Sequence, residues 1–297
     1  MSWQQKLENN QIVVIDGGTG SELQRQGVPM SEAAWSGLAV HSHPEVVRSV
    51  HEAYIAAGAE VIITNTFGTA RFLLEPAGLG GEFERINRDA VRLAAEARDP
   101  SGKDVAIAGS ISNLPPGMNA ANYPDPGAEL AGLRELAKIL ADSGVDLIAL
   151  EMMQDTRHAA RAMEAALETG LPVWLGVSCR QRAGGGGLVS FDLPGVDFAR
   201  PLDTLIPMGP SVVNIMHSDI NVTPEAIAMV RERWAGPIGV YPEVGEFVPP
   251  NWTFDSDATP ERLVEHARSW IDCGALLVGG CCGTTPAHIA ALAAAFG

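Results

Sequence analysis

Basic residues are scarce in this chain of 297 residues, and their scarcity excludes two classes of partner. Lys and Arg together number 20 against 36 Asp and Glu, so the formal net charge at pH 7 is −16. Nucleic acids and anionic membranes are bound through basic surfaces that neutralise their phosphates. We therefore expect neither nucleic acid nor membrane among the partners of this protein.

Long apolar runs and cysteines are also scarce. No apolar run approaches the roughly 20 residues that a transmembrane helix needs, and the polar start MSWQQKLENNQ lacks the core of a signal peptide. We therefore predict a cytoplasmic protein. Four cysteines in so long a chain do not make a disulfide framework. The adjacent Cys281 and Cys282 would form only a strained vicinal disulfide, but as thiolates they would be good soft metal ligands.

Eight short apolar runs, rich in β-branched residues, recur along the chain. Most of them lack polar alternation, which is typical of strands buried on both faces of a parallel sheet. Helical patterns that end in glycine, such as PEVVRSVHEAYIAAG, lie between them. The runs cover residues 12–16, 61–67, 105–110, 147–151, 173–178, 212–216, 238–243 and 275–280.

This alternation predicts a single (β/α)8 barrel in which residues 1–297 form one domain. A doubly wound sheet is the alternative, but the phosphate-loop patterns GxGxxG and GxxxxGK[ST] are both absent. Four consecutive glycines at 184–187 follow the fifth run and precede no helical pattern. We interpret them as a flexible loop with a possible role as a lid.

Polar residues follow the predicted strands at the end where such barrels carry their chemistry. They are Asp16, Thr64 to Thr66, Ser110, Glu151, Ser178, Cys179, Asn214, His217, Glu243, Cys281 and Cys282. An isolated Asp16 or Glu151 could simply cap a helix or hold a loop. Two carboxylates and two thiols at one barrel mouth favour a functional site.

Several segments resemble, in order, the homocysteine S-methyltransferase family, which includes the betaine–homocysteine and S-methylmethionine–homocysteine methyltransferases. The resemblance covers nearly the whole chain, and its most specific segment is GGCCGTTPAHI. The other segments are VVIDGGTGSELQRQG, TNTFGT, LIALEMMQD, VVNIM and VYPEVGE.

The resemblance implies a zinc-bearing (β/α)8 barrel that acts as an S-methyltransferase on small molecules. Zinc would be held by a cysteine after strand six and by the pair Cys281 and Cys282. Homocysteine would bind as its thiolate and take a methyl group from a sulfonium or quaternary ammonium donor, which gives methionine. A free thiol has a pKa of about 8.5, and zinc lowers it enough to hold the thiolate. The glycines before the cysteines would let the backbone turn so that both sulfur atoms face one ion.

The same resemblance suggests which residues bind substrate. Asp16 and Glu151 would hold the amino group of homocysteine and act as the catalytic pair, since an ammonium needs charged acceptors. Four further residues at the strand ends are candidates for substrate binding: Thr66, Ser110, Asn214 and Glu243.

The chain departs from the family pattern at four places. Ile215 stands where the strand-six motif Gly-x-Asn-Cys has its cysteine, and Glu243 stands where the family has Asn. Met152 replaces the usual Thr after Glu151, and the segment GSISNLPPG at 109–117 differs from Gly-Ser-Ile-Gly-Pro. Two thiolates alone make a poor tetrahedral zinc site, so the departure at Ile215 bears directly on the metal.

Three interpretations of the metal site remain open. His217 supplies an imidazole ligand, Glu243 supplies a carboxylate, or the metal is lost. A histidine at a strand end is more often a hydrogen-bonding residue, and Glu243 could bind a cationic substrate instead. We expect Cys179 to be a small core residue and Cys273 to be structural.

Three functions follow from these interpretations. The first is the methyltransferase described above. The second is a barrel with an incomplete or absent zinc site and another acceptor. The third is a non-catalytic paralogue that binds and senses an amino acid or onium compound.

Overall fold

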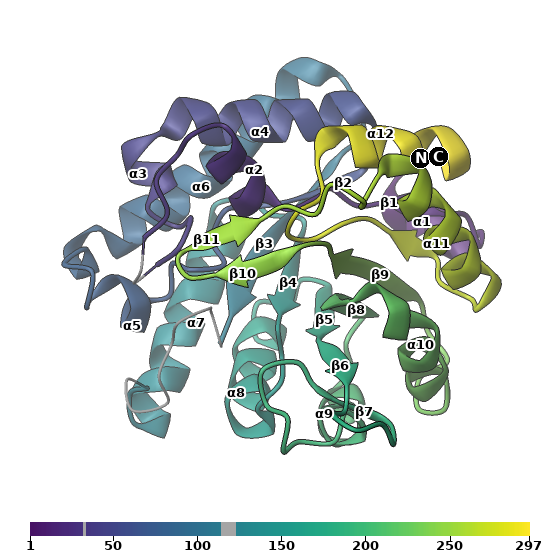
Figure 1. Ribbon diagram of the computed structural model, residues 1–297. Coiled ribbons are helices and arrows are strands. Elements are labelled where there is room, and N and C mark those ends of the chain that lie inside the picture. Colours follow the sequence, from purple (N-terminus) through teal and green to yellow (C-terminus); the bar gives the residue numbers. More distant parts are fainter. Residues whose placement is uncertain (32–33, 114–122) are drawn as a thin grey trace.

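Eight parallel strands close into a barrel in the computed structural model, which describes residues 1–31, 34–113 and 123–297 (Figure 1). In the sheet the strands follow the order β1-β12-β9-β8-β5-β4-β3-β2, and a parallel bridge between Ile15 and Val61 joins the two ends. The predicted (β/α)8 barrel is therefore confirmed, and the doubly wound sheet is excluded. The barrel strands are β1 (Val13–Val14), β2 (Val61–Ile63), β3 (Ala106–Ser112), β4 (Leu147–Glu151), β5 (Val173–Val177), β8 (Val212–Asp219), β9 (Ile238–Glu243) and β12 (Leu277–Val278).

Helices surround the barrel (Figure 1). Gly58, with φ of 103°, ends the helix that precedes the second strand, as its sequence pattern predicts. The helices are α1 (Trp3–Glu8), α2 (Thr19–Arg25), α3 (Ala39–Ser42), α4 (Pro44–Ala57), α5 (Arg71–Leu74), α6 (Phe83–Arg98), α7 (Pro126–Asp142), α8 (Thr156–Leu167), α9 (Ala199–Leu205), α10 (Thr223–Arg231), α11 (Pro260–Asp272) and α12 (Pro286–Phe296). Short 3-10 turns are η1 (Gly80–Glu82), η2 (Asp99–Ser101), η4 (Ile206–Met208) and η5 (Ile220–Val222).

Two antiparallel hairpins extend from the barrel. One joins β6 (Cys179–Gln181) to β7 (Leu188–Ser190), and the other joins β10 (Glu246–Val248) to β11 (Asn251–Thr253). The glycine run 184–187 connects β6 to β7, and all four glycines have φ between 82° and 102°. The run is a hairpin turn that needs left-handed backbone, so glycine suits it. A role as a lid stays a prediction.

The core has two layers because successive strand residues point to opposite faces. Trp174 and Met216 belong to a cluster inside the barrel, whereas Val213 belongs to a cluster shared with the surrounding helices. The ring of Trp3, on α1, packs edge-on against Trp174 at a centroid distance of 5.3 Å. Since Trp174 lies near the start of β5, α1 closes the barrel at the end opposite the strand C-termini.

No helix in the described part of the chain is long and apolar enough to cross a membrane. Residues 114–117 of the departing segment 109–117 lie outside the described residues.

Candidate active site

A small cavity of about 70 Å³ opens at the C-terminal ends of the barrel strands. Its walls contain a carboxylate, an imidazole and two thiols, which come from the ends of β4, β8 and β12. The residues that line it include Trp35, Phe67, Glu151, Met152, Met216, His217, Tyr241, Phe247, Trp252, Cys281 and Cys282.

The two cysteines follow β12 and are tied to the end of β9. The Cys281 N–H donates to the carbonyl of Pro242 at 2.9 Å, and the Val244 N–H donates to the carbonyl of Cys282 at 2.9 Å. Both thiols are therefore carried by backbone that continues the sheet, which limits how far the sulfur atoms can move.

Glycines flank the cysteines for reasons that differ from the sequence-based expectation. Gly279 and Gly280 have no left-handed backbone; they are required by close packing, because a Cβ would lie 2.8 Å from Ile15 Cβ at Gly279 and would collide with Thr284 at Gly280. The left-handed residue is Gly283, with φ of 83°. The turn that directs the thiols is thus completed after them, not before them.

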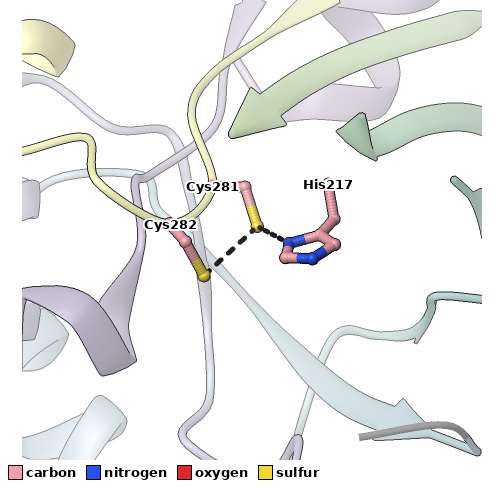
Figure 2. A group of neighbouring side chains, drawn as sticks. All are labelled: His217, Cys281 and Cys282. Atoms are coloured by element: carbon pink, nitrogen blue, oxygen red, sulfur yellow. Dashed lines mark hydrogen bonds between the residues drawn. The ribbon is translucent and has the colours of Figure 1, made fainter. Parts of the chain in front are cut away.

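Three potential metal ligands converge in the cavity (Figure 2). The ligand atoms of His217, Cys281 and Cys282 all lie within 4.8 Å of one another. His217 Nδ1 is 3.7 Å from Cys281 Sγ, and the two sulfur atoms are 4.0 Å apart. These three side chains could hold a metal ion with two sulfur donors and one nitrogen donor.

The structure corrects the expectation that Ile215 occupies the ligand position on strand six. Ile215 is fully buried in the cluster between the barrel and the helices. The register of β8 against β9 shifts between Met216 and Asp219, and His217 has φ of 42°. This irregularity brings the imidazole of His217 to the sulfur atoms. In a regular strand His217 would lie about 6–7 Å beyond Ile215, but the irregularity keeps its imidazole next to the sulfur atoms.

Glu243 lies beside the three ligand candidates but not among them. Its Oε2 atom is 3.0 Å from Nδ1 of His217, and both side chains are largely buried. Burial lowers the pKa of His217, but the Glu243 carboxylate and the Cys281 sulfur outweigh it, so the pKa stands well above its usual value.

The two thiols are unequal. Contact with the Cys282 thiol lowers the pKa of Cys281 to about 5, against the effect of burial and with further help from His217. The same contact, together with burial, raises the pKa of Cys282 well above its usual value. Of the two thiols, Cys281 is therefore the one that loses its proton more readily, and the thiolate is the form that binds metals.

Asp16 and Glu151 form the acidic side of the site. Asp16 Oδ2 accepts a hydrogen bond from the Ile63 N–H at 2.8 Å, whereas Oδ1 is buried with no hydrogen-bond partner among the described residues. Glu151 Oε2 accepts from Ser110 Oγ at 2.5 Å. The Oδ1 atom of Asp16 is thus left free to accept a hydrogen bond from a ligand.

Both carboxylates are held in an environment that disfavours their charge. Burial, and next the Cys281 sulfur, raise the pKa of Glu151 to about 7. Burial is also the main cause that raises the pKa of Asp16 well above its usual value, and Glu151 and Cys281 add to it. No Lys or Arg is found among the described residues that line the cavity. Two buried carboxylates without a cation favour the binding of a cationic ligand.

Three other predicted substrate-binding residues lie behind the cavity wall. The Thr66 hydroxyl donates to the carbonyl of Ser110 at 2.7 Å, and Ser110 in turn donates to Glu151. Asn214 is fully buried inside the barrel opposite Gly239, one layer below the mouth. Asp16, Glu151 and Cys281, three of the residues placed at the strand ends by the sequence, lie close together at the mouth, whereas Asn214, another of them, does not.

The remaining cysteines lie away from the cavity. Cys179 is fully buried, and burial is the main cause that raises its pKa to about 12, so it is a core residue as expected. Cys273 is exposed at the C-terminal end of α11.

Aromatic residues that the sequence analysis missed form one wall of the cavity. Trp35 packs edge-on against both Phe67 and Phe247, and Phe247 stacks on Trp252 at 6.3 Å. All four line the cavity, as do the sulfur-containing Met152 and Met216. Phe67, four residues after β2, was the available signal, but Phe247 and Trp252 come from the β10–β11 hairpin and Trp35 from the segment before α3, which only the fold brings together.

Comparison with known proteins identifies the family. The sequence pattern described as homocysteine S-methyltransferase matches residues 13–296. The chain belongs to the homocysteine S-methyltransferase family. Family membership confirms the resemblance seen in the sequence, and with it the prediction of a methyltransferase enzyme.

Relatives of this family member extend over almost the whole chain. A selenocysteine methyltransferase from Astragalus bisulcatus is 30% identical, with 92% of this chain and 89% of the relative covered. The homocysteine S-methyltransferase YbgG from Bacillus subtilis (strain 168) is 28% identical, with 97% and 95% covered. The metallated form of the homocysteine methyltransferase MmuM from Escherichia coli has the same fold, with a TM-score of 0.78 at 23% identity over 98% of each chain.

Proposed function

We propose that this protein transfers a methyl group from a sulfonium or quaternary ammonium donor to the thiol of homocysteine, which gives methionine. We further propose that zinc is its cofactor, that its other partners are small molecules, and that residues 1–297 act as one barrel domain. The observation that carries the proposal is the meeting of His217, Cys281 and Cys282 within 4.8 Å, beside two buried carboxylates.

The donor set supports zinc. Two thiolates and one imidazole match the protein ligands of known catalytic zinc sites, which leave the fourth position to water or substrate. A zinc ion held by Cys281, Cys282 and His217 would lower the pKa of the acceptor thiol and keep it as a thiolate. The loss of a strand-six cysteine is then compensated by an imidazole from the same strand.

The carboxylates support an amino-acid acceptor. The free Oδ1 of Asp16 and the carboxylate of Glu151 would accept hydrogen bonds from the α-ammonium, and Ser110 would keep Glu151 oriented. The ammonium would also remove the electrostatic cost of two buried acids close together. Asp16 and Glu151 thus bind and orient the acceptor, while Thr66 acts through Ser110.

The aromatic wall supports an onium donor. Rings attract organic cations through their π-faces, and Trp35, Phe67, Phe247 and Trp252 offer such faces beside the thiols. In the transfer step the acceptor sulfur forms a bond to the methyl carbon as the donor's C–S or C–N bond breaks. The bonding electrons leave with a neutral thioether or amine. Because an anion and a cation become neutral, an apolar cavity that excludes water favours the step.

A selenol acceptor is a second candidate, favoured by the 30% identity to a selenocysteine methyltransferase. One experiment tests both acceptors. Zinc content of the purified protein is measured, and methyl transfer is assayed by mass spectrometry with S-methylmethionine, S-adenosylmethionine or betaine as donor. We expect one zinc per chain and methylated homocysteine, or methylated selenocysteine, with at least one donor.

The Cys281→Ser variant is the control, since it removes one proposed ligand and should abolish both zinc retention and turnover. Zinc-loaded parent protein that methylates neither acceptor with any of the donors would refute the catalytic proposal and favour an amino-acid sensor. Methyl transfer by zinc-free protein would refute the proposal that zinc is the cofactor.

A further inference from the structure

The hydroxyl of Tyr241 is a buried polar group that contacts within the protein do not explain. Tyr241 belongs to β9, is only 1% exposed and lines the cavity that contains the thiols. Its Oη atom has no hydrogen-bond partner within residues 1–31, 34–113 and 123–297. A buried hydroxyl without a partner lowers the stability of the folded protein, so its presence in a cavity wall points to a ligand.

Gly176 on β5 leaves space for this hydroxyl. A Cβ atom at Gly176 would lie 3.3 Å from Tyr241 Oη and 2.5 Å from the carbonyl oxygen of Leu150. The phenol ring therefore extends from β9 past β8, so that its hydroxyl reaches β5 next to the end of β4. Glu151 is the last residue of β4 and lines the same cavity. The hydroxyl thus lies on the side of the site that carries the carboxylates.

The electrostatic environment of the hydroxyl is negative. Burial is the main cause that raises the pKa of Tyr241 well above its usual value, and the Glu151 carboxylate is the next, with smaller effects of Cys281 and Asp16. The phenol therefore keeps its proton and can both donate and accept a hydrogen bond. Ser110 Oγ donates to Oε2 of Glu151, so the other carboxylate oxygen remains as an acceptor for a second donor.

The number of acceptors around the site suggests what the hydroxyl binds. An α-ammonium has three N–H groups, each of which needs an acceptor when it is buried. The proposed function gives two of them to Asp16 Oδ1 and the Glu151 carboxylate, and a lone pair of Tyr241 Oη is available for the third. The hydroxyl hydrogen would then be directed to Glu151, so that every polar group in the set has a partner.

We propose that Tyr241 is a substrate-binding residue whose hydroxyl accepts a hydrogen bond from the α-ammonium of the acceptor and donates one to the Glu151 carboxylate. The inference rests on the proposed function for the presence of an amino-acid acceptor. Its test measures binding and does not depend on methyl transfer.

The test compares three thiols by isothermal titration calorimetry, on the protein as purified and under reducing conditions. They are homocysteine, 3-mercaptopropylamine, which lacks the carboxylate, and 4-mercaptobutyrate, which lacks the amino group. A hydrogen bond to a charged group is stronger than one between neutral groups, so we expect Tyr241→Phe to weaken homocysteine binding about 10- to 100-fold. The loss should be similar for 3-mercaptopropylamine and absent for 4-mercaptobutyrate.

Thermal unfolding without ligand separates a binding role from a structural one. Tyr241→Phe removes an unpaired buried hydroxyl, so its melting temperature should equal or exceed that of the parent. Tyr54→Phe is the matched control, because the Tyr54 hydroxyl is also buried but donates to the carbonyl of Thr284 at 3.2 Å. Loss of that hydrogen bond should lower the melting temperature by about 2–4 °C.

Three results would overturn the inference. Unchanged homocysteine affinity in Tyr241→Phe would remove the contact. A loss of affinity that includes 4-mercaptobutyrate would assign the hydroxyl to the carboxylate or the thiol of the acceptor. A melting temperature that falls as in Tyr54→Phe would make the hydroxyl structural. The proposed function is judged separately: if Tyr241→Phe binds homocysteine as the parent does while the parent methylates it, only the inference fails. If the affinities follow the expected pattern but no methyl group is transferred, only the proposed function fails.

Discussion

Replacing Asp16 by Asn tests the proposed ammonium site directly, because the substitution changes charge with little change in shape. The Asn side chain can still accept the hydrogen bond that Asp16 receives from the Ile63 N–H. The buried Oδ1, which has no hydrogen-bond partner among the described residues, is the atom assigned to the ligand. The variant therefore removes the ammonium contact and leaves the loop attached to β2.

The magnitude follows from burial. Asp16 is fully buried, and truncating one partner of a buried, hydrogen-bonded charge pair costs about 2–5 kcal/mol. At about 1.4 kcal/mol per factor of ten, this range corresponds to a loss of homocysteine affinity between about 30-fold and a few thousandfold. Glu151→Gln should fall in the same range, since Glu151 is also buried and lines the cavity beside the thiols.

Isothermal titration calorimetry with two ligands isolates the contact. Homocysteine should lose affinity for the variant, whereas 4-mercaptobutyrate, which lacks the amino group, should bind parent and variant equally. Glu22→Gln is the matched control, because Glu22 is a buried carboxylate that already pairs with Arg25 at 2.9 Å. Equal losses for both ligands, or no loss for homocysteine, would refute the assignment of Asp16.

Three further predictions concern stability, the donor and the thiol loop. Burial lowers the pKa of His51 from 6.5 to about 4. The unfolded chain therefore takes up the proton first, and the free energy of unfolding should fall by about 3 kcal/mol as pH drops from 7 to 4. Urea unfolding of the parent and His51→Leu, both with chelator, should show this loss only in the parent; parallel pH profiles would contradict it. Phe247→Leu removes one aromatic face from the cavity and should raise the KM for an onium donor about three- to tenfold, with homocysteine affinity unchanged; the reverse pattern in steady-state kinetics would count against a donor site there. Gly283→Ala forces a side chain into left-handed backbone against the Val244 carbonyl, so thermal unfolding and zinc titration should show a loss of more than about 1 kcal/mol of stability and weaker metal binding; a variant as stable as the parent would show that the turn is not constrained.

The sequence allowed the position of part of the candidate site to be predicted, but not the contacts of its side chains. Asp16, Glu151 and the cysteine pair could be placed at one mouth because residues that end parallel strands of a barrel must meet at one face. Substrate binding by Ser110 and Thr66 stays a prediction; in the structure the Ser110 hydroxyl donates to Glu151 and the Thr66 hydroxyl donates to the carbonyl of Ser110. A strand-end position fixes the height of a residue in the barrel, not the direction of its side chain.

The sequence by itself determined the barrel and the family. Eight buried β-branched runs and glycine-terminated helices leave few other ways to bury their apolar faces, and the GGCCGTTPAHI segment marked the thiol site. Tertiary structure alone decided where the side chains of Ile215 and His217 point. Regular alternation along β8 would put the side chains of Ile215 and His217 on the same outer face of the barrel. The loss of register at the end of β8 turns His217 toward Cys281 and leaves Ile215 in the outer core. Such an irregularity arises from contacts between β8, β9 and the aromatic rings around His217, which lie far apart in the sequence. Only folding brings together the residues that place the His217 imidazole beside the thiols of Cys281 and Cys282.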